Sequence, residues 1–328
     1  MDLLKVEDCD SSVLNEPHDL FICASGYERR STHLFQKLIG NPKFRALVFG
    51  FESSCQPDWR AESDAVFERH RTAVTLVSGD QETTIFEILG RVVPKYQKLR
   101  IVIDYSSMPR SWMNAIINFF KFGIDFVDIE LLFSYTRGRH IGRASVPEYP
   151  VSDYLISRID SLTTLEGAAV RQNKTLAVVG LGFEWIAPFA ACELLEPDEV
   201  KVFYANPGSL PDYADRALGL NRRFLDEFFR DGVPLGISVA SVESVFRIVA
   251  ELVAPSLGLR NVALIPLGPK PHVLGCMLVS NRLRDVTCMY VRGARQIVQQ
   301  VEAVEEVAPV VTKVQFAKIG IAEVETDE

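Results

Sequence analysis

The segment Phe21-Ile22-Cys23-Ala24-Ser25-Gly26-Tyr27-Glu28 is a short apolar run that ends in Gly, an aromatic residue and Glu. A second segment, Ala177-Val178-Val179-Gly180-Leu181-Gly182-Phe183-Glu184, has the same pattern. Three further blocks recur in the same order at an offset of about 155–160 residues, which is far longer than the period of a solenoid repeat. These blocks are 84–88 with 244–248, 100–110 with 261–270, and 135–138 with 290–293. The repetition predicts two homologous domains in one chain.

Short apolar runs alternate with helix patterns along both parts of the chain. In the first part the runs cover 20–24, 46–51, 73–77, 99–103 and 128–135. In the second part they cover 175–179, 200–204, 235–240, 261–266 and 286–290. Continuously apolar strands between helices are typical of parallel sheets that are covered on both faces. The sequence therefore predicts an α/β fold of two duplicated, Rossmann-like, three-layer domains with mainly parallel sheets, related by a pseudo-two-fold axis.

The same pattern places domain boundaries near residues 140 and 174. Residues 1–139 form the predicted N-terminal Rossmann-like domain, and residues 174–328 form the predicted C-terminal one. Residues 140–173 connect them, beginning with a basic turn and including a predicted helix over 151–162. The C-terminal domain ends in a tail with an apolar-periodic stretch, 297–304, and a strand-like run, 309–316.

Composition narrows the classes of protein to consider. The 328 residues carry a net charge of −8. Proteins that bind nucleic acids or membrane surfaces without specificity usually have a positively charged surface. No apolar run reaches the ~18 residues of a membrane span, and the N-terminal residues lack the apolar core of a signal peptide. The six cysteines form no C-x-x-C pair, which favours buried free thiols in a reducing compartment. We therefore expect a cytoplasmic protein without general nucleic-acid or membrane binding.

The loops that follow the strands are the places to look for a ligand site, because ligands of doubly wound sheets bind beyond the carboxyl ends of the strands. After the first strand, Gly26 permits a sharp turn, and Tyr27 and Arg29 follow it. An arginine there offers donors to phosphate or carboxylate, although a simple turn with a helix cap explains the same residues. In the matching loop, Gly182 is followed by Trp185, which replaces the third Gly of a dinucleotide fingerprint. No cofactor is predicted.

The loop after the fourth strand has the densest polar chemistry in the chain. It contains Asp104, Ser106, Ser107 and Arg110, the last of which follows a proline placed to open a helix. Hydroxyls and free backbone N–H groups there suit phosphate oxygens or ribose hydroxyls, and an arginine suits an anion. The alternative is a capped helix start with solvated polar residues. The counterpart loop keeps a proline and a cation, and its candidate binding residues are Lys270 and His272.

Each fifth strand ends in the pattern Tyr-x-Arg-Gly, which makes Arg137 and Arg292 candidate binding residues. One interpretation is structural, with the tyrosine packed over the end of the sheet and the glycine adopting a positive φ. The other is that an arginine from each half faces a common anionic ligand. The loop at 205–211 is explained by turn chemistry alone.

Other chemical motifs are missing from the sequence. It has no metal-ligand spacing such as H-E-x-x-H, no Walker motif and no G-x-S-x-G elbow, so no metal site is predicted. Glu28, Asp104 and Glu184 remain as candidate acid–base residues if burial perturbs their carboxyl groups.

The loop after the fourth strand resembles that of the CARF domains, the CRISPR-associated Rossmann-fold sensors. In that family the fourth strand is followed by Asn/Asp-x-Ser/Thr-Gly-Gly-Thr-Lys/Arg, which opens a helix. Asp104, Ser106 and Arg110 match three positions of the pattern, whereas the glycine pair is replaced here. The segment 268–271 resembles the end of the same pattern, without its leading acid and hydroxyl.

Two such domains in one chain are similar to the SAVED domain, a sensor of cyclic oligonucleotides in antiphage signalling. The resemblance implies binding of a cyclic or short oligonucleotide between the two halves. It also implies a separate effector protein, because no nuclease, protease or toxin domain is visible in this sequence. Some CARF proteins cleave their ligand, so the resemblance also leaves room for an enzyme.

We therefore expect a sensor or regulator that binds a phosphate-bearing nucleotide or oligonucleotide, with a role in antiviral defence. A nucleotide-processing enzyme, either a hydrolase or a glycosidase that uses Glu28, Asp104 or Glu184, is the first alternative. An assembly scaffold is the second alternative. Turnover of a nucleotide would favour the enzyme, and binding without turnover would favour the sensor.

Overall fold

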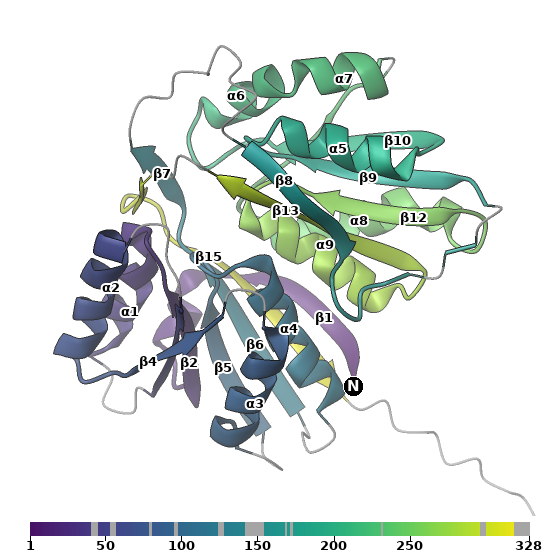
Figure 1. The fold of residues 1–328 in the computed structure, drawn as a ribbon. Coiled ribbons are helices and arrows are strands. Elements are labelled where there is room, and N and C mark those ends of the chain that lie inside the picture. The colour runs from purple at the N-terminus through teal and green to yellow at the C-terminus, as the bar shows by residue number, and fades with distance from the viewer. Residues whose placement is uncertain are drawn as a thin grey trace, which may run out of the picture.

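Two large sheets divide the described residues into two lobes, drawn one above the other in Figure 1. The computed structural model describes residues 1–40, 45–52, 57–78, 81–94, 98–123, 128–141, 154–167, 169–170, 173–230, 232–295 and 300–317.

The first lobe is built on a seven-stranded sheet in the order β1-β15-β6-β5-β2-β3-β4. Its strands are β1 (Asp2–Cys9), β2 (Leu20–Ser25), β3 (Ala46–Phe51), β4 (Val74–Val77), β5 (Lys98–Asp104), β6 (Asp128–Tyr135) and β15 (Val310–Ala317). Its helices are α1 (His33–Leu38), α2 (Pro57–Arg69), α3 (Glu82–Val92) and α4 (Arg110–Phe122). The strands from β4 to β6 run parallel, whereas β15 runs antiparallel to both β6 and β1.

The second lobe is built on a six-stranded sheet in the order β11-β10-β9-β12-β13-β8. Its strands are β8 (Tyr154–Ser161), β9 (Thr175–Leu181), β10 (Glu199–Ala205), β11 (Leu235–Ile237), β12 (Asn261–Pro266) and β13 (Val286–Arg295). Its helices are α5 (Ile186–Leu195), α6 (Tyr213–Leu220), α7 (Arg222–Phe228), α8 (Val242–Val253) and α9 (Lys270–Arg282). Only β8 runs antiparallel to its neighbour, β13.

The parallel strands of the two sheets follow the same order, β4-β3-β2-β5-β6 in one lobe and β11-β10-β9-β12-β13 in the other. The direction of winding reverses between β2 and β5, and again between β9 and β12, which are the switch points where such sheets bind ligands. In this order α3 corresponds to α8, and α4 corresponds to α9. The predicted α/β fold with mainly parallel sheets is confirmed.

One hydrophobic core runs through both lobes. It includes Trp112 and Ile116 of α4, Val245 of α8 and Leu274 of α9, together with the sheet faces that these helices cover. In Figure 1, α8 and α9 lie beneath the second sheet and face β1 and α4 of the first lobe. The outer face of each sheet has its own smaller core, under α1 and α2 in the first lobe and under α5 and α7 in the second. The shared core fixes the two lobes against each other.

Polar contacts also hold the lobes together. The Nζ atom of Lys121, in the last turn of α4, donates a hydrogen bond of 2.9 Å to the carbonyl of Asn281, in the last turn of α9. On the far side, the carboxylate of Asp8 in β1 accepts hydrogen bonds from the Ser241 hydroxyl at 2.5 Å and from the Glu243 N–H at 3.3 Å. Both donors belong to the N-terminal end of α8, so an acidic side chain of the first lobe occupies that end of the helix.

The segment between the lobes differs from the sequence prediction. The predicted helix over 151–162 is wrong where the structure describes it, because Tyr154–Ser161 is strand β8 and pairs with β13. The helical spacing of its apolar residues is overridden by pairing with a distant strand. The short strand β7 (Gly138–Ile141) pairs with β14 (Gln300–Ala303), so the two passages of the chain between the lobes lie together.

The tail also differs from the predicted domain boundaries. The strand predicted at 309–316 is present as β15, but it lies between β1 and β6 in the first sheet. The tail of the predicted 174–328 domain therefore belongs to the first lobe, and β8, from the predicted connecting segment, belongs to the second. Strand β1 and helices α6 and α7 were not predicted.

Two further expectations concern the cysteines and the membrane. Cys23, Cys192, Cys276 and Cys288 are buried free thiols, whereas Cys55 lies outside the described residues. No helix in the described ranges is both long enough and apolar enough to cross a membrane.

Candidate functional site

The loops at the two switch points meet between the lobes. In the first lobe, Gly26 follows β2 and packs against the loop after β5: a Cβ atom at Gly26 would lie 3.0 Å from the Cβ of Ser107. In the second lobe, Gly182 follows β9 and packs against the loop after β12: a Cβ atom there would lie 2.2 Å from the carbonyl oxygen of Leu267. Glycine at both positions lets the paired loops approach closely.

The loop after β5 folds around the buried carboxyl group of Asp104. One oxygen of this carboxyl accepts a hydrogen bond of 3.0 Å from the backbone N–H of Ser106. The other oxygen is buried and accepts no hydrogen bond from the described residues. The Ser106 hydroxyl accepts a hydrogen bond of 2.8 Å from the backbone N–H of Thr136, which fixes this loop to the end of β6. The Ser107 hydroxyl is buried and has no hydrogen-bond partner among the described residues.

A buried arginine joins the first loop to the end of β6. Arg30 is only 7% exposed, and its Nε atom donates a hydrogen bond of 2.6 Å to the carboxylate of Glu28. Its Nη1 atom donates to the Tyr135 hydroxyl at 3.0 Å, and its guanidinium lies 5.1 Å from the centre of that ring. A Cβ atom at Gly138 would lie 2.7 Å from the same Nη1 atom. The glycine of the first Tyr-x-Arg-Gly pattern is therefore explained by the close approach of Arg30. A positive φ does not explain it, because Gly138 does not adopt one.

Lys270 reaches this cluster from the second lobe. Its Nζ atom donates a hydrogen bond of 2.5 Å to the carbonyl oxygen of Ser106. Lys270 is the first residue of α9, and Arg110 is the first residue of α4, which is the corresponding helix in the first lobe. In both helices the preceding residue is a proline in an extended conformation, and neither helix has a side-chain cap. Two cations from different lobes are thus placed at the positive ends of two helices, where an anion is favoured.

The protonation equilibria of the cluster reflect burial and mutual attraction. Burial lowers the pKa of Lys270 to about 8; attraction by Glu28 opposes the shift, and repulsion by Arg30 adds to it. Burial raises the pKa of Asp104 to about 6, against its hydrogen bonds from Ser106 and the attraction of Arg30 and Lys270. Burial alone would also raise the pKa of Glu28, but Arg30 and Lys270 outweigh it and lower that pKa. A proton can therefore exchange at Asp104 or Lys270 near neutral pH.

Aromatic side chains from the second lobe border the cluster. The ring of Phe183, which follows Gly182, contacts the ring of Tyr213 with 5.1 Å between centroids and that of His140 with 5.7 Å. The guanidinium of Arg216 lies 4.6 Å from the centre of the Phe183 ring. The Tyr213 hydroxyl accepts a hydrogen bond of 2.9 Å from the His140 N–H. Two half-buried rings, Phe183 and Tyr213, therefore lie beside a cation near the meeting loops.

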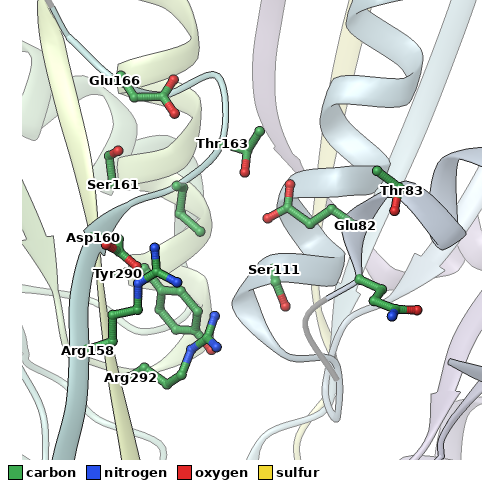
Figure 2. A pocket seen from close by; sticks show the side chains of 12 residues that line it. Glu82, Thr83, Ser111, Arg158, Asp160, Ser161, Thr163, Glu166, Tyr290 and Arg292 are labelled. Atoms are coloured by element: carbon green, nitrogen blue, oxygen red, sulfur yellow. Dashed lines mark ion pairs between the residues drawn. The ribbon is translucent and has the colours of Figure 1, made fainter. Parts of the chain in front are cut away.

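A groove of about 540 Å³ lies between the lobes, and Ser111 in the first turn of α4 lines it. Figure 2 shows Glu82, Thr83 and Ser111 of the first lobe on one side of this groove. Arg158, Asp160, Tyr290 and Arg292 line the opposite side, and the loop that contains Thr163 and Glu166 closes one end. The groove thus shares the first turn of α4 with the Lys270 cluster.

Several predicted binding residues lie elsewhere. His272 is fully buried beside Phe203 in the second lobe, where burial lowers its pKa to about 4, so its ring does not join Lys270. Arg29 is exposed and forms an ion pair of 2.8 Å with Glu302 of β14. Arg292 lines the groove, and its guanidinium lies 5.5 Å from the centre of the Tyr290 ring.

The remaining predicted residues lie at the loop margins. Tyr27 is half-buried, and its carbonyl accepts a hydrogen bond from Gln300. Trp185 and Glu184 are half-buried at the start of α5. Arg137 is half-buried; its Nε atom donates to no described residue, and burial lowers its pKa.

The sequence analysis assigned no binding role to three residues of this region: Tyr135, Phe183 and Tyr213. A signal for Phe183 was present, since it occupies the aromatic position between Gly and Glu in the repeated pattern. Arg30 and Tyr135 are brought together only by the parallel arrangement of β2 and β6 in the sheet. Tyr213 begins α6, which was not predicted, so no pattern pointed to it.

Within the described ranges, no group of three or more His, Cys, Asp or Glu side chains is arranged to hold a metal ion. Comparison with protein-family models gives no match, and no curated protein is significantly similar to the chain.

Proposed function

We propose that this protein binds a phosphate-bearing nucleotide, in the form of a cyclic or short oligonucleotide, where the switch-point loops of its two lobes meet. The observation that carries the proposal is the position of Lys270 and Arg110. These cations begin corresponding helices of different lobes, and Lys270 is held over the Ser106 carbonyl. Repulsion by Arg110 contributes to the lowered pKa of Lys270, and a bound phosphate would relieve that repulsion.

The shape of the site supports a ligand with more than one phosphate. Arg110 and Lys270 occupy corresponding positions in two lobes with the same strand order. A ligand with repeated phosphates could place one phosphate at each of these two cations. We propose that this correspondence reflects a duplication with an approximate two-fold axis between α4 and α9. Half-buried aromatic rings at the margin, Phe183 above all, would stack on a base, which contributes ~1–3 kcal/mol per base.

The proposed role is that of a sensor. The ligand would contact both lobes at once, so binding would stabilise one arrangement of the lobes over others. The proposal also includes an antiphage role and a separate effector protein. These two elements rest only on the resemblance of the 104–110 loop to CARF domains.

Binding measurements with defined ligands test the proposal. Isothermal titration calorimetry with a panel of cyclic di-, tri- and tetranucleotides should find at least one ligand that binds the intact protein. Arg110→Ala and Lys270→Ala should each weaken that binding tenfold or more, while thermal unfolding stays within a few degrees for Arg110→Ala because its side chain is only half-buried at the start of α4. Arg139→Ala, an exposed cation of β7, is the control. Equal binding by Arg110→Ala, Lys270→Ala and the parent protein would contradict the site.

An enzymatic function is the second candidate, and one observation favours it. Asp104 has a pKa of about 6, raised by burial, and one of its carboxyl oxygens accepts no hydrogen bond from the described residues. Such a carboxyl group can transfer a proton near neutral pH. Chromatography of the bound ligand after incubation distinguishes the cases. Turnover that Asp104→Asn abolishes would establish the enzyme, and an unchanged ligand would favour the sensor.

A further inference from the structure

We infer that the peptide group between Thr163 and Thr164 is a two-position switch that fastens the second lobe to helix α4 of the first lobe. The switch does not depend on the function proposed above. Three features support it: a strained residue in a tight turn, a carbonyl group that α4 holds in place, and a buried amide oxygen that is free to serve the second position.

The turn that follows β8 holds a threonine in a conformation that suits glycine. The Leu165 N–H donates a hydrogen bond of 2.9 Å to the Leu162 carbonyl, which closes a four-residue β-turn. The third residue of the turn, Thr164, has a φ of 64°, whereas Thr163 has no positive φ. A positive φ at the third position alone indicates a type II turn, which favours glycine or asparagine there. A β-branched residue is strained in this conformation.

Contacts with α4 hold the turn in its strained form. The carbonyl oxygen of Thr163 accepts two hydrogen bonds, one from Nδ2 of Asn114 at 2.9 Å and one from Nδ2 of Asn118 at 3.1 Å. The Thr164 hydroxyl donates a third hydrogen bond, of 2.7 Å, to Oδ1 of Asn118. Hydrogen bonds between the lobes therefore offset the strain at Thr164.

Rotation of the central peptide group would relieve that strain. Type I and type II turns differ mainly by a half-turn of this peptide, which changes φ of the third residue from about +80° to about −90°. In the rotated position Thr164 would have an ordinary φ, and its N–H would point toward α4 in place of the Thr163 carbonyl. The rotation gives up hydrogen bonds and releases strain, and these two contributions are of the same order.

Asn114 is suited to both positions of the switch. Its side chain is fully buried, and its Oδ1 atom accepts no hydrogen bond from the described residues. A side-chain amide both donates and accepts, so Asn114 can bind the Thr163 carbonyl through Nδ2 in one position and the Thr164 N–H through Oδ1 in the other. A buried acceptor without a partner disfavours the present position, which brings the two positions closer in free energy.

The switch acts on the helix that begins with Arg110. Arg110, Asn114 and Asn118 follow one another at intervals of four residues, so they lie along one face of α4. Thr163 also lines the groove between the lobes, and both threonines line a second cavity of about 420 Å³ beside it. Rotation of the peptide would therefore change how the second lobe is fastened to α4 and which polar group the turn directs toward that helix.

Crystal structures of the full chain with substitutions at residue 164 test the switch. Valine keeps the β-branched shape of threonine but lacks the hydroxyl that binds Asn118, so Thr164→Val should adopt the rotated position, with a negative φ at residue 164. Glycine adopts a positive φ without strain, so Thr164→Gly should keep the present position. Thr163→Val is the matched control, because it makes the same chemical change at a residue without positive φ, and it should leave the peptide as in the parent protein.

Relaxation-dispersion NMR of the backbone amides of residues 164 and 165 measures exchange between the positions on the microsecond-to-millisecond timescale. The parent protein should show this exchange, and the population of the rotated position should fall at least tenfold in Thr164→Gly. Both threonines are exposed, so the variants should unfold within a few degrees of the parent protein. The switch is ruled out if Thr164→Val keeps the Thr163 carbonyl on Asn114 and Asn118, or if Thr164→Gly and the parent protein give the same relaxation profiles.

Discussion

The Nζ atom of Lys270 lies 2.5 Å from the backbone oxygen of Ser106, although the two residues are 164 positions apart in the chain. This contact connects the switch points of two different sheets. A lysine that could extend into water is instead held among Glu28, Arg30 and Asp104, where burial disfavours its charge. A buried polar network of this kind is expected at functional sites.

Binding of a phosphate ligand at Lys270 should take up a proton. Burial lowers the pKa of Lys270 to about 8, so about half of these side chains are neutral at pH 8 in the free protein. A bound anion favours the ammonium form and raises the pKa, so affinity should fall as the pH rises above 8. Calorimetry at pH 8 in buffers of different ionisation enthalpy measures the proton taken up. Lys270→Arg should bind without that uptake, because arginine keeps its charge at this pH.

Asp104→Asn should stabilise the protein increasingly as the pH rises. The pKa of Asp104 in the fold is about 6, above its ordinary value of 3.8, because burial disfavours the carboxylate. The stability that the protonated Asp104 carboxyl group contributes is therefore fully present below pH 3.8, and it is lost as the pH rises through 6. The loss amounts to at most ~3 kcal/mol. Urea unfolding of both proteins at pH 4 and pH 7 measures the difference, and equal differences at the two pH values would contradict the prediction.

Gly182→Ala should destabilise the second lobe more than Gly26→Ala destabilises the first. The new methyl group would lie 2.2 Å from the backbone oxygen of Leu267, whereas at Gly26 it would lie 3.0 Å from a side-chain atom of Ser107. Overpacking against backbone that cannot move away costs about 1–3 kcal/mol. Gly219→Ala in α6 is the control, since among the described residues no atom beyond its own helical turn and chain neighbours lies within 4 Å of the added methyl group, and alanine favours the helix. Chemical denaturation should rank the three variants in that order.

Asp8→Ala should weaken the attachment of α8 to the first lobe. The carboxylate of Asp8 accepts hydrogen bonds from Ser241, from the N–H of Glu243 and, at 2.9 Å, from the hydroxyl of the buried Thr312. Removing a charged acceptor from such donors costs about 2–3 kcal/mol in the free energy of unfolding. Asp10→Ala is the matched control, because that side chain accepts only from Ser12 within the described residues, and its loss should cost about 1 kcal/mol. Equal effects of the two substitutions would contradict this role.

Sequence patterns were sufficient for the sheets and for part of the site. Continuous apolar runs predicted the parallel strands because strands covered on both faces have no polar side. The turn residues after these runs predicted which loops lie at the strand ends, and Lys270 and Ser106 do lie in contact there. Whether these residues bind a ligand stays a prediction.

Long-range pairing accounts for most of what the sequence did not predict. The apolar residues of 154–161 have a helical spacing, and only pairing with β13 makes this segment a strand. The groove was missed for that reason, since Arg158 belongs to that strand. The sequence did not show which way His272 points, because successive residues in the first turn of a helix point in different directions. Its ring faces the core of the second lobe, beside Phe203.

The position of β15 has a consequence for how the protein is made. Among the described strands of the first sheet, β1 pairs only with β15, at residues 310–317. A ribosome adds about 5–20 residues per second, so β1 waits about 15–60 seconds before its partner exists. The parallel strands of both lobes can form during that interval. Strand β1 can therefore pair in the first sheet only after the strands and helices that separate it from β15 have been synthesised.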